Sequence, residues 1–348
     1  AELFQEDLEQ EKRQIRLGYI EDYSSGPSET VTQLSDGLLE IRSDEVSGQR
    51  HSQEIFSQST FSGQLPGTGE FDIGLGWRWQ HDSDFGGHLA PALSARQSWT
   101  LANRWQLQTR QSLGNGYRVA NLKERYYEFD HSIYGYRVSG NPDLTPEQSR
   151  SIQLSASLTD RQNWQLELSA FHNRITDLIE TADSGEVDTS NGGYVVLYRY
   201  ANIERAMTRG LELSGQWQIT PDLQQRMSFN YLDARDLGTD LPLINRARRH
   251  ARLIWLWDAS DRLKLNLTGE YQGGLIASVD SSNGQQRPSP DYWRWDLSAS
   301  LDSRWGGYEQ RWFTGVRNLA DQVRNSADSY DRRPVEGRYL YAGFDWRF

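Results

Sequence analysis

The last nine residues of the chain, L-Y-A-G-F-D-W-R-F, alternate between apolar and polar positions. In a β-strand every second side chain lies on the same face, so one face of this segment is apolar and aromatic while the other tolerates water. A soluble sandwich strand rarely leaves such a row of aromatic side chains uncovered. The pattern therefore predicts a strand in a wall between lipid and a polar lumen. The apolar positions of this barrel-terminal pattern are Leu340, Ala342, Phe344, Trp346 and Phe348.

The same period of two recurs upstream, at residues 71–80, 211–219, 263–272 and 293–302. In the last of these segments, tryptophan and leucine alternate with arginine, aspartate and serine. Segments of about ten residues with this alternation, separated by turn residues, are typical of an all-β, transmembrane antiparallel β-barrel. A water-soluble antiparallel protein is the alternative.

The composition fits a barrel and excludes a helical membrane protein. The 348 residues are 36% hydrophobic with a mean hydropathy of -0.77, and no apolar stretch of about 18 residues occurs. Low hydropathy is compatible with a barrel because half of each strand faces a wet lumen. The 13 Trp and 17 Tyr suit aromatic girdles at the two membrane interfaces. Since no linker divides the chain, we expect one barrel over 1–348, with a less regular strand pattern over 1–85 than over 86–348.

Enzyme motifs are missing from the sequence. The chain has no cysteine, and its six histidines form no metal-binding motif. It has no nucleophile elbow, phosphate-binding loop or dinucleotide motif. The net charge of -11 argues against a nucleic-acid partner. We therefore predict a protein that is not an enzyme and has no resident metal or cofactor; a hydrolase whose Ser, His and Asp are brought together by the fold is an alternative.

The turn residues predict about sixteen strands whose connections alternate between short and long. Near the N-terminus we expect a strand over 12–23, a turn at 26–28 and a hairpin turn at 35–37. If Phe348 lies at the periplasmic end, the tight turns from Pro66 onward are all periplasmic and the long connections are all outside, as in bacterial outer-membrane barrels. The predicted outer connections are 118–146, 177–193, 236–245, 276–291 and 319–335.

Two motifs flank the first long connection: G-N-G-Y-R-V-A-N-L-K-E ends one strand, and G-N-P-D-L-T-P-E begins the next. This pair resembles the middle of the barrel of a TonB-dependent outer-membrane receptor. Shorter matches at 173–179, 200–212, 318–321 and 337–348 follow in the family's order, so the resemblance covers 86–348. The motif residues are Gly114, Gly116, Tyr117, Arg118, Leu122, Glu124, Gly140, Asn141, Pro142, Leu144, Pro146 and Glu147.

The motif residues have physical roles that do not require a ligand. Asn141 and Pro142 restrict the backbone where the connection re-enters the wall, and Pro146 ends it. Gly114 and Gly116 allow close backbone approach near a strand end. Contact with a ligand and purely structural use of these residues are both open at this point.

The resemblance implies uptake of a large scarce nutrient, such as an iron–siderophore, haem or cobalamin-like chelate. Haem receptors of this family place a ligand histidine between the two motifs, where this chain has His131. An aromatic loop that touches another large chelate is the alternative. Residues expected to stack on the ligand are Tyr126, Tyr127, Phe129, Tyr134 and Tyr136. Arginines expected to attract an anionic chelate, unless they are solvated loop charges, are Arg118, Arg125 and Arg137.

A second basic cluster opens the strand that follows the connection 236–245. We expect it to bind lipopolysaccharide phosphates or an anionic ligand, or to be a hydrated strand end. Its members are Arg246, Arg248, Arg249, His250 and Arg252.

The chain departs from the family pattern in length. TonB-dependent receptors have about 22 strands and a plug in the lumen, whereas the strands expected here correspond to the last sixteen. Explanations are a fragment, a receptor divided between two chains, or a smaller barrel without a plug; we favour a divided or truncated receptor. Its expected partners are outer-membrane lipid and lipopolysaccharide, a plug-bearing chain or the missing N-terminal part of the receptor, and TonB through that plug only. The rival interpretation is a plugless passive pore or a structural subunit of an outer-membrane complex.

Overall fold

The computed structural model describes residues 2–8, 11–33, 39–67, 69–101, 104–190, 194–279, 283–305, 307–323 and 336–347. Seventeen strands form one sheet, and two short strands form a second sheet. In the described residues, no helix is both long and apolar enough to cross a membrane. The chain is therefore built from strands, as the alternating sequence pattern predicts.

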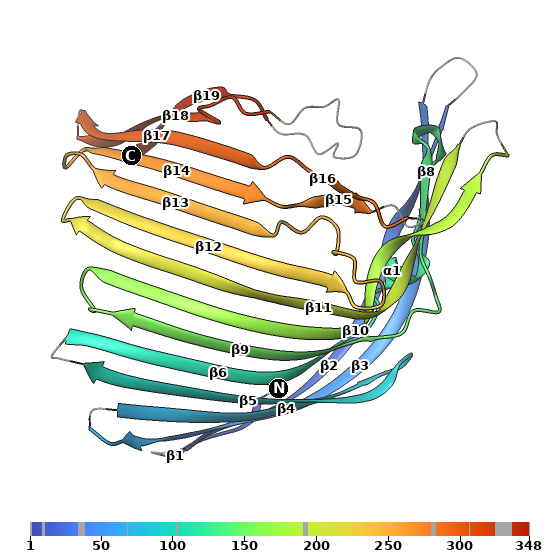
Figure 1. Ribbon diagram of the computed structural model, residues 1–348, viewed down its shortest axis with the longest axis horizontal. Coiled ribbons are helices and arrows are strands. Elements are labelled where there is room, and N and C mark those ends of the chain that lie inside the picture. The colour runs from blue at the N-terminus through green and yellow to red at the C-terminus, as the bar shows by residue number, and fades with distance from the viewer. Residues whose placement is uncertain are drawn as a thin grey trace.

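Most strands form one curved wall (Figure 1). Its first half contains β1 (Glu2–Leu8), β2 (Glu11–Gln33), β3 (Leu39–Leu65), β4 (Gly69–Asp82), β5 (Gly86–Leu101), β6 (Trp105–Arg118), β9 (Glu147–Thr159) and β10 (Trp164–Asp188). Its second half contains β11 (Val195–Thr220), β12 (Leu223–Asp236), β13 (Arg249–Asp258), β14 (Leu263–Gly273), β17 (Tyr292–Trp305), β18 (Tyr308–Arg317) and β19 (Tyr339–Arg347). Small elements within the connections are α1 (Leu122–Tyr126), β7 (Glu128–His131), η2 (Ser132–Tyr134), β8 (Tyr136–Ser139), β15 (Ile276–Val279) and β16 (Gln286–Pro288).

The wall strands pair antiparallel in chain order. Strand β6 pairs with β9, and β14 with β17, across the elements inserted between them. In the described ladders β1 pairs with β2 and β19 pairs with β18, and no ladder joins β19 to β1 or β2. The structure therefore confirms the predicted all-β antiparallel barrel wall and shows it with an open seam (Figure 1).

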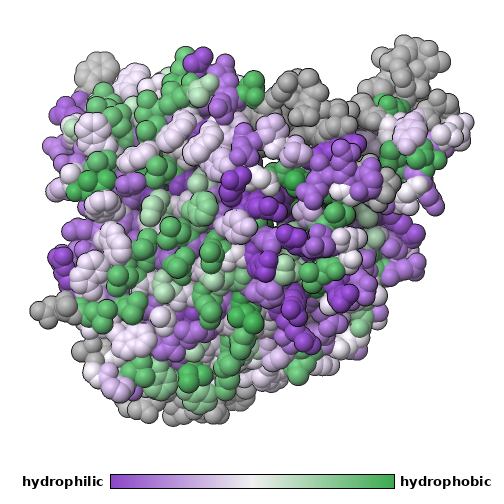
Figure 2. All heavy atoms as spheres, viewed as in Figure 1, coloured by the Kyte–Doolittle hydropathy of each residue, from purple (hydrophilic) through white to green (hydrophobic). Residues whose placement is uncertain are grey.

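One face of the wall is apolar. The registers place leucine opposite leucine on that face, for example Leu267 beside Leu297. Leu154, Leu168 and Leu211 on three adjacent strands are 51%, 52% and 50% exposed, which is unfavourable in water and favourable in lipid. On the face seen in Figure 2, hydrophobic residues gather over the strands, and a hydrophilic zone separates them from the long connections. The alternation predicted from the sequence is thus confirmed as a lipid-facing surface.

Short turns and long connections lie at opposite ends of the strands, except that the short turn between β4 and β5 lies at the end of the long connections (Figure 1). The turn between β9 and β10 shows how the short ones are held: Asp160 Oδ1 accepts hydrogen bonds from the backbone N–H groups of Gln162, Asn163 and Trp164 at 3.0, 2.8 and 2.8 Å. The long connections, which include residues 119–146 and 237–248, lie at the other end. Apart from the β4–β5 turn, this separation confirms the predicted alternation of connection lengths. The outer connection expected at 177–193 is shorter than predicted, because β10 continues through Asp188, which pairs with Val195 of β11.

The N-terminal strands differ from the prediction. The turn expected at 26–28 is wrong, because β2 continues through these residues and pairs in unbroken register with β3, with Pro27 opposite Glu45. In the described ladders, the other edge of β2 has no partner between Arg16 and Glu29, so a proline there need not interrupt a ladder. The hairpin turn expected at 35–37 and the terminal Phe348 lie outside the described residues.

Strands β2, β3, β10 and β11 are the longest, with 23, 27, 25 and 26 residues. Their far ends extend beyond the shorter strands between them, on the side of the long connections (Figure 1). The β7–β8 hairpin, part of the connection between β6 and β9, joins these extensions because β7 pairs parallel with β2 and β8 pairs parallel with β11. The connection is therefore a folded part of the sheet.

Because β11 and β12 pack closely at Gly210, replacing this glycine should destabilise the protein. A Cβ atom on Gly210 of β11 would collide with the carbonyl oxygen of Tyr231 on β12, whereas a Cβ atom on Gly76 meets its nearest neighbour, Ser57 O, at 3.7 Å. Gly210→Ala should lower the free energy of unfolding by about 1–3 kcal/mol, and Gly76→Ala should change it much less. Urea titration of the heat-modifiable band in gels measures both; equal midpoints would contradict the packing.

Candidate functional site

The base of the connection between β6 and β9 is held by one arginine between two carboxylates. Arg118, the last residue of β6, donates from Nη1 to Glu124 at 2.9 Å and from Nε to Glu147 Oε2 at 2.7 Å. Glu147, the first residue of β9, also accepts a hydrogen bond from the backbone N–H of Ile179 at 2.8 Å. These bonds connect β6, α1, β9 and β10 at the mouth of the wall, so three residues of the sequence motifs are structural partners of one another.

Helix α1 and the second motif are built against each other. Asn121 caps α1: its side chain accepts from Glu124 N at 2.8 Å, and the Glu124 carboxylate accepts from Asn121 N at 2.8 Å. A Cβ atom on Gly140 would lie 2.6 Å from the backbone of Arg125, so only glycine fits where the returning chain crosses the helix. The first and second motifs therefore specify one compact crossing.

Asn141 fastens this crossing to β11. Its Nδ2 donates to the carbonyl of Tyr200 at 2.9 Å, and its Oδ1 accepts from Asp143 N and from Arg199 Nη2, both at 3.1 Å. Two residues further along β11, Asn202 Nδ2 donates to Thr145 O at 2.9 Å. The two asparagines explain why a connection of this length has a defined structure.

A small apolar core lies under the crossing. Ala120, Leu144 and Ile179 are buried together, with Phe85 and Tyr200 packed against them. Leu122 of α1 is buried as well. Because this core is buried within the protein, it stabilises the outer connection independently of the membrane.

Arg125 of α1 contacts both an acidic residue and two aromatic rings. It forms an ion pair with Asp84 in the turn between β4 and β5, and its guanidinium lies 5.2 Å from the ring centroid of Phe85 and 4.9 Å from that of Tyr126. Burial opposes the charged form of Asp84, but hydrogen bonds from Arg125 and Ser83 and the charges of Arg125 and Arg50 outweigh it and hold the pKa of Asp84 below its usual range. Arg125 thus locks α1 to the wall.

The aromatic residues gather on the β7–β8 hairpin. The Phe129 ring lies 3.8 Å from the His131 ring, 5.8 Å from the Tyr127 ring and 6.1 Å from the Tyr136 ring, centroid to centroid. Tyr136 Oη and His131 Nδ1 are 3.2 Å apart. Lys123 Nζ lies 4.7 Å from the Tyr127 ring centroid. The hairpin therefore carries a half-buried aromatic cluster, defined as Tyr127, Phe129, His131 and Tyr136.

The structure divides the predicted site residues into two groups. The first builds the crossing: Arg118, Leu122, Glu124, Arg125, Gly140, Asn141, Leu144 and Glu147. The second is the aromatic cluster, next to which Arg137 Nε lies 3.5 Å from Asp130 Oδ2. The side chain of Tyr134 lies outside the described part of the chain. Contact with a ligand remains a prediction for both groups.

The other motif residues lie at the strand ends. Tyr117 stacks on His88 with ring centroids 4.0 Å apart. A Cβ atom on Gly114 would meet only Ala92 Cβ, at 4.0 Å, so packing does not require glycine there. Pro142 is exposed and Pro146 is half-buried.

The basic cluster predicted at 246–252 is dispersed. Arg246 Nη2 lies 2.6 Å from Glu180 Oε1, Arg249 Nη2 lies 3.7 Å from Asp291 Oδ2, and His250 Nε2 lies 3.1 Å from Glu270 Oε1. Successive strand residues point to opposite faces, so Arg249 and His250 do not face one ligand. These residues pair separately with acids on β10, on β14 and in the connection before β17.

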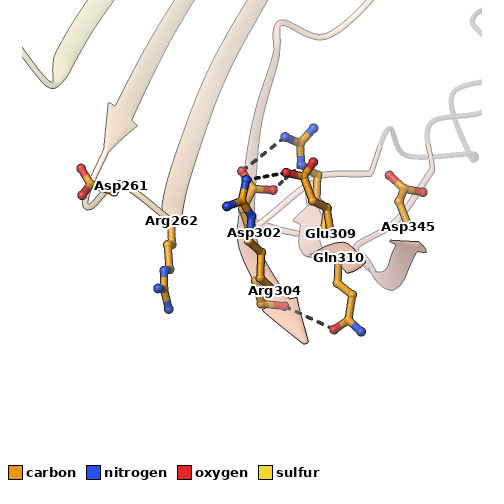
Figure 3. A pocket seen from close by; sticks show the side chains of 9 residues that line it. Asp261, Arg262, Asp302, Arg304, Glu309, Gln310 and Asp345 are labelled. Carbon is orange, nitrogen blue, oxygen red and sulfur yellow. Dashed lines mark hydrogen bonds and ion pairs between the residues drawn. The ribbon is translucent and has the colours of Figure 1, made fainter. Parts of the chain in front are cut away.

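A cavity of about 370 Å³ lies at the short-turn end, between the β13–β14 turn and strands β17, β18 and β19 (Figure 3). Two ion pairs line it: Arg311 Nε lies 2.7 Å from Asp302 Oδ1, and Arg304 Nη2 lies 2.7 Å from Glu309 Oε1. The registers place Arg311 between Asp302 and Asp345 on three adjacent strands. These pairs fix the strand register at this end of the wall.

No metal site is evident, because no three His, Cys, Asp or Glu side chains of the described residues could hold an ion together. Sequence reasoning missed the acidic partners on the β4–β5 turn. Asp82 is fully buried, Arg50 Nε lies 3.3 Å from its Oδ2, and Arg50 Nη1 donates to Ala120 O at 2.9 Å. Nothing in the sequence around Asp82 or Arg50 indicates that they meet residue 120.

The lipid-facing wall, the short turns at one end and the folded connections at the other define an integral β-barrel protein of the bacterial outer membrane. Residues 10–319 match the family described as "TonB dependent receptor-like, beta-barrel". The chain belongs to this family, as the two motifs predict.

The relatives are an outer-membrane protein, two receptors and a transporter. The chain is 24% identical over 268 residues to the "Iron-regulated outer membrane virulence protein" of Vibrio cholerae, covering 74% of this chain and 40% of that protein. Its fold is similar to the siderophore receptor PirA from Pseudomonas aeruginosa (TM-score 0.63, 19% identity, 96% of this chain and 53% of that one). It is also similar to a variant of the ferric enterobactin receptor PfeA from the same organism (0.67, 19%, 96% and 51%) and to the copper transporter OprC (0.67, 14%, 98% and 55%). The chain thus spans about half the length of these relatives.

The Asn141 bonds predict that one amide holds the outer crossing. Asn141→Ala removes its bonds to the backbone of Tyr200 and Asp143 and should cost about 1–3 kcal/mol. Limited proteolysis of intact cells should then cut within 119–146 faster than in the wild type. Asn115→Ala, at an exposed position with no bonded side chain among the described residues, is the control. Equal cleavage rates in both variants would contradict this role.

The ion pair between Asp84 and Arg125 should stabilise the protein in a pH-dependent way. Because its folded-state pKa is lowered, the Arg125 pair contributes stability above the ordinary aspartate value of about 3.9, and that contribution disappears as pH falls through the folded pKa. Asp84→Asn should be less stable than wild type at pH 7, and the difference should shrink toward pH 3. Asp143→Asn, at an exposed position, should follow the wild type. The thermal midpoints of both proteins are measured between pH 7 and pH 3. A difference between Asp84→Asn and the wild type that does not change with pH would contradict the role of the Arg125–Asp84 pair.

Proposed function

We propose that this chain is the barrel wall of an outer-membrane receptor for a large, scarce nutrient, with an iron–siderophore complex as the first candidate cargo and haem or a cobalamin-like chelate as the others. Uptake is energy-coupled through TonB, which acts on a plug contributed from outside these 348 residues. The relatives named for iron, siderophore and enterobactin support the cargo class, and the copper transporter broadens it to metal complexes.

The observation that carries the proposal is the aromatic cluster on the β7–β8 hairpin. It lies between the extended ends of β2 and β11, at the end of the wall where the long connections lie (Figure 1). Stacked rings present large, rigid apolar faces, which suit planar or aromatic chelating groups. The crossing below holds the hairpin through Arg118, Arg125 and Asn141, so the rings are preorganised and less binding energy is lost in ordering them.

The division of labour follows from these contacts. The crossing residues are engaged with carboxylates and backbone groups of the protein, so they position the hairpin. The aromatic cluster, with Arg137 and Lys123 beside it, contacts the cargo. Half-buried side chains keep part of their surface available for this contact.

The cargo contact is tested with one aromatic variant. Phe129 lies at the centre of the cluster, so Phe129→Ala should weaken binding of the cognate chelate about tenfold, equivalent to about 1.4 kcal/mol. Protein purified from outer membranes is titrated with ferric enterobactin, haem and cyanocobalamin, and tryptophan fluorescence quenching is recorded. Tyr194→Ala, a highly exposed aromatic residue of the next connection, is the control and should bind as the wild type.

Two outcomes would overturn the proposal. Phe129→Ala and Tyr194→Ala could bind all three probes as the wild type does, which would place the cargo elsewhere. Steady ion conductance of the wild type in planar bilayers, without any chelate, would instead support a passive pore. Selective loss of haem binding in His131→Gln would identify haem as the cargo.

A further inference from the structure

Two arginines face each other across adjacent strands near the outer end of the wall. Arg150 of β9 is directly opposite Arg174 of β10. Both side chains are exposed, and neither has a hydrogen-bond or ion-pair partner among the described residues. Opposite residues in an antiparallel pair have Cβ atoms about 5 Å apart, and like charges at that spacing destabilise the sheet. A site with two unpaired positive charges is complementary to an anion.

Both arginines project from the lipid side of the wall. Side chains alternate along a strand, and Ile152 and Leu154 share the face of Arg150. These two apolar residues are 46% and 51% exposed. Ser151 and Gln153, on the other face of β9, line a hollow on the inner side together with Glu212 of β11. The arginine pair therefore faces the membrane environment and not the lumen that carries cargo.

The pair lies at the edge of the apolar band. The row of the ladder that contains Leu154 continues through Ala170 and Leu211 to Tyr231, all apolar or aromatic. The row of Arg150 lies four residues beyond the row of Leu154, which is two same-face steps of about 7 Å each, or about 13 Å along the strand. Mixed residues fill the row between, from Ile152 to Asp233. This is the depth at which acyl chains give way to headgroups.

The neighbouring strands extend the positive charge. The row of Arg150 and Arg174 continues through Met207 to Arg235, and Arg209 lies one row closer to the apolar band. Arg209 and Arg235 share one buried acid, Asp233, at 3.0 and 2.9 Å. Arg209 and Arg235 flank this buried carboxylate, and Arg174 and Arg150 lie on the two strands beyond them. The hydrophilic zone in Figure 2 lies at this level of the wall, between the apolar surface and the long connections.

We propose that Arg150 and Arg174 form a binding site for a phosphate group of a phosphorylated glycolipid in the outer leaflet. Each guanidinium presents a planar fork that matches phosphate oxygens, so one phosphate bridges the two strands and removes the repulsion between the arginines. Arg209 and Arg235 add positive charge beside this site. Ile152 and Leu154 contact the acyl chains. The occupant is a lipid because the site adjoins the apolar band on the outer surface.

The test compares lipids that differ only in phosphate. Protein purified from outer membranes into zwitterionic detergent is titrated with bisphosphorylated lipid A, with dephosphorylated lipid A and with inorganic phosphate, and bound lipid is counted by native mass spectrometry. Arg150→Gln combined with Arg174→Gln should weaken binding of the phosphorylated lipid at least tenfold. Arg110→Gln, on the opposite face of β6, is the charge-matched control and should bind like the wild type.

Thermal midpoints of the single variant Arg174→Gln test the same site, even if the double variant folds poorly. In detergent without phosphorylated lipid, Arg174→Gln removes the repulsion and should match or exceed the wild-type midpoint. Added bisphosphorylated lipid A should raise the midpoint of the wild type by several degrees and leave that of Arg174→Gln unchanged. Equal effects of the two lipids, equal binding by the double variant, or displacement of the lipid by equimolar inorganic phosphate would overturn the lipid-phosphate site.

Discussion

The interstrand backbone hydrogen bond is the interaction on which the whole structure depends. In hydrocarbon, an unpaired N–H or C=O group costs several kcal/mol, so a chain with these alternating segments can cross the membrane only as a paired sheet. The ladders from β1 to β19 supply this pairing for most of the wall. Strand β19 pairs only with β18 in the described residues, so its free edge also needs a strand partner in lipid.

Outside the lipid the constraint changes, because the connection between β6 and β9 must hold its backbone groups without a membrane. It does so with charged side chains that bind backbone and carboxylates together, as Arg118 and Glu147 do. The small core around Leu144 excludes water from these bonds. The motif that identifies the family therefore mainly serves to fold the outer connection.

The strands and their facing could be predicted because they depend on local period. The alternation at 263–272 or 293–302 is visible within ten residues, and the registers confirm it. Contacts of Arg50 with Ala120 and of Arg125 with Asp84 join residues 70 and 41 positions apart, and no local pattern encodes them. The turn predicted at 26–28 failed for a related reason. Proline breaks a strand only where its missing N–H is needed, and that depends on which neighbour the strand has.

The arginine pair illustrates how a local rule and a long-range register combine. Arg150 and Arg174 are both recognisable as outward positions from alternation alone, yet their meeting depends on the β9–β10 hairpin register. That register is fixed by the Asp160 turn at the other end of the two strands. A one-residue slip would turn every leucine of β10 toward the lumen, so the lipid environment maintains the register that brings the two charges together. The repulsion between them is therefore imposed by the fold, and an anion from the membrane surface is what relieves it.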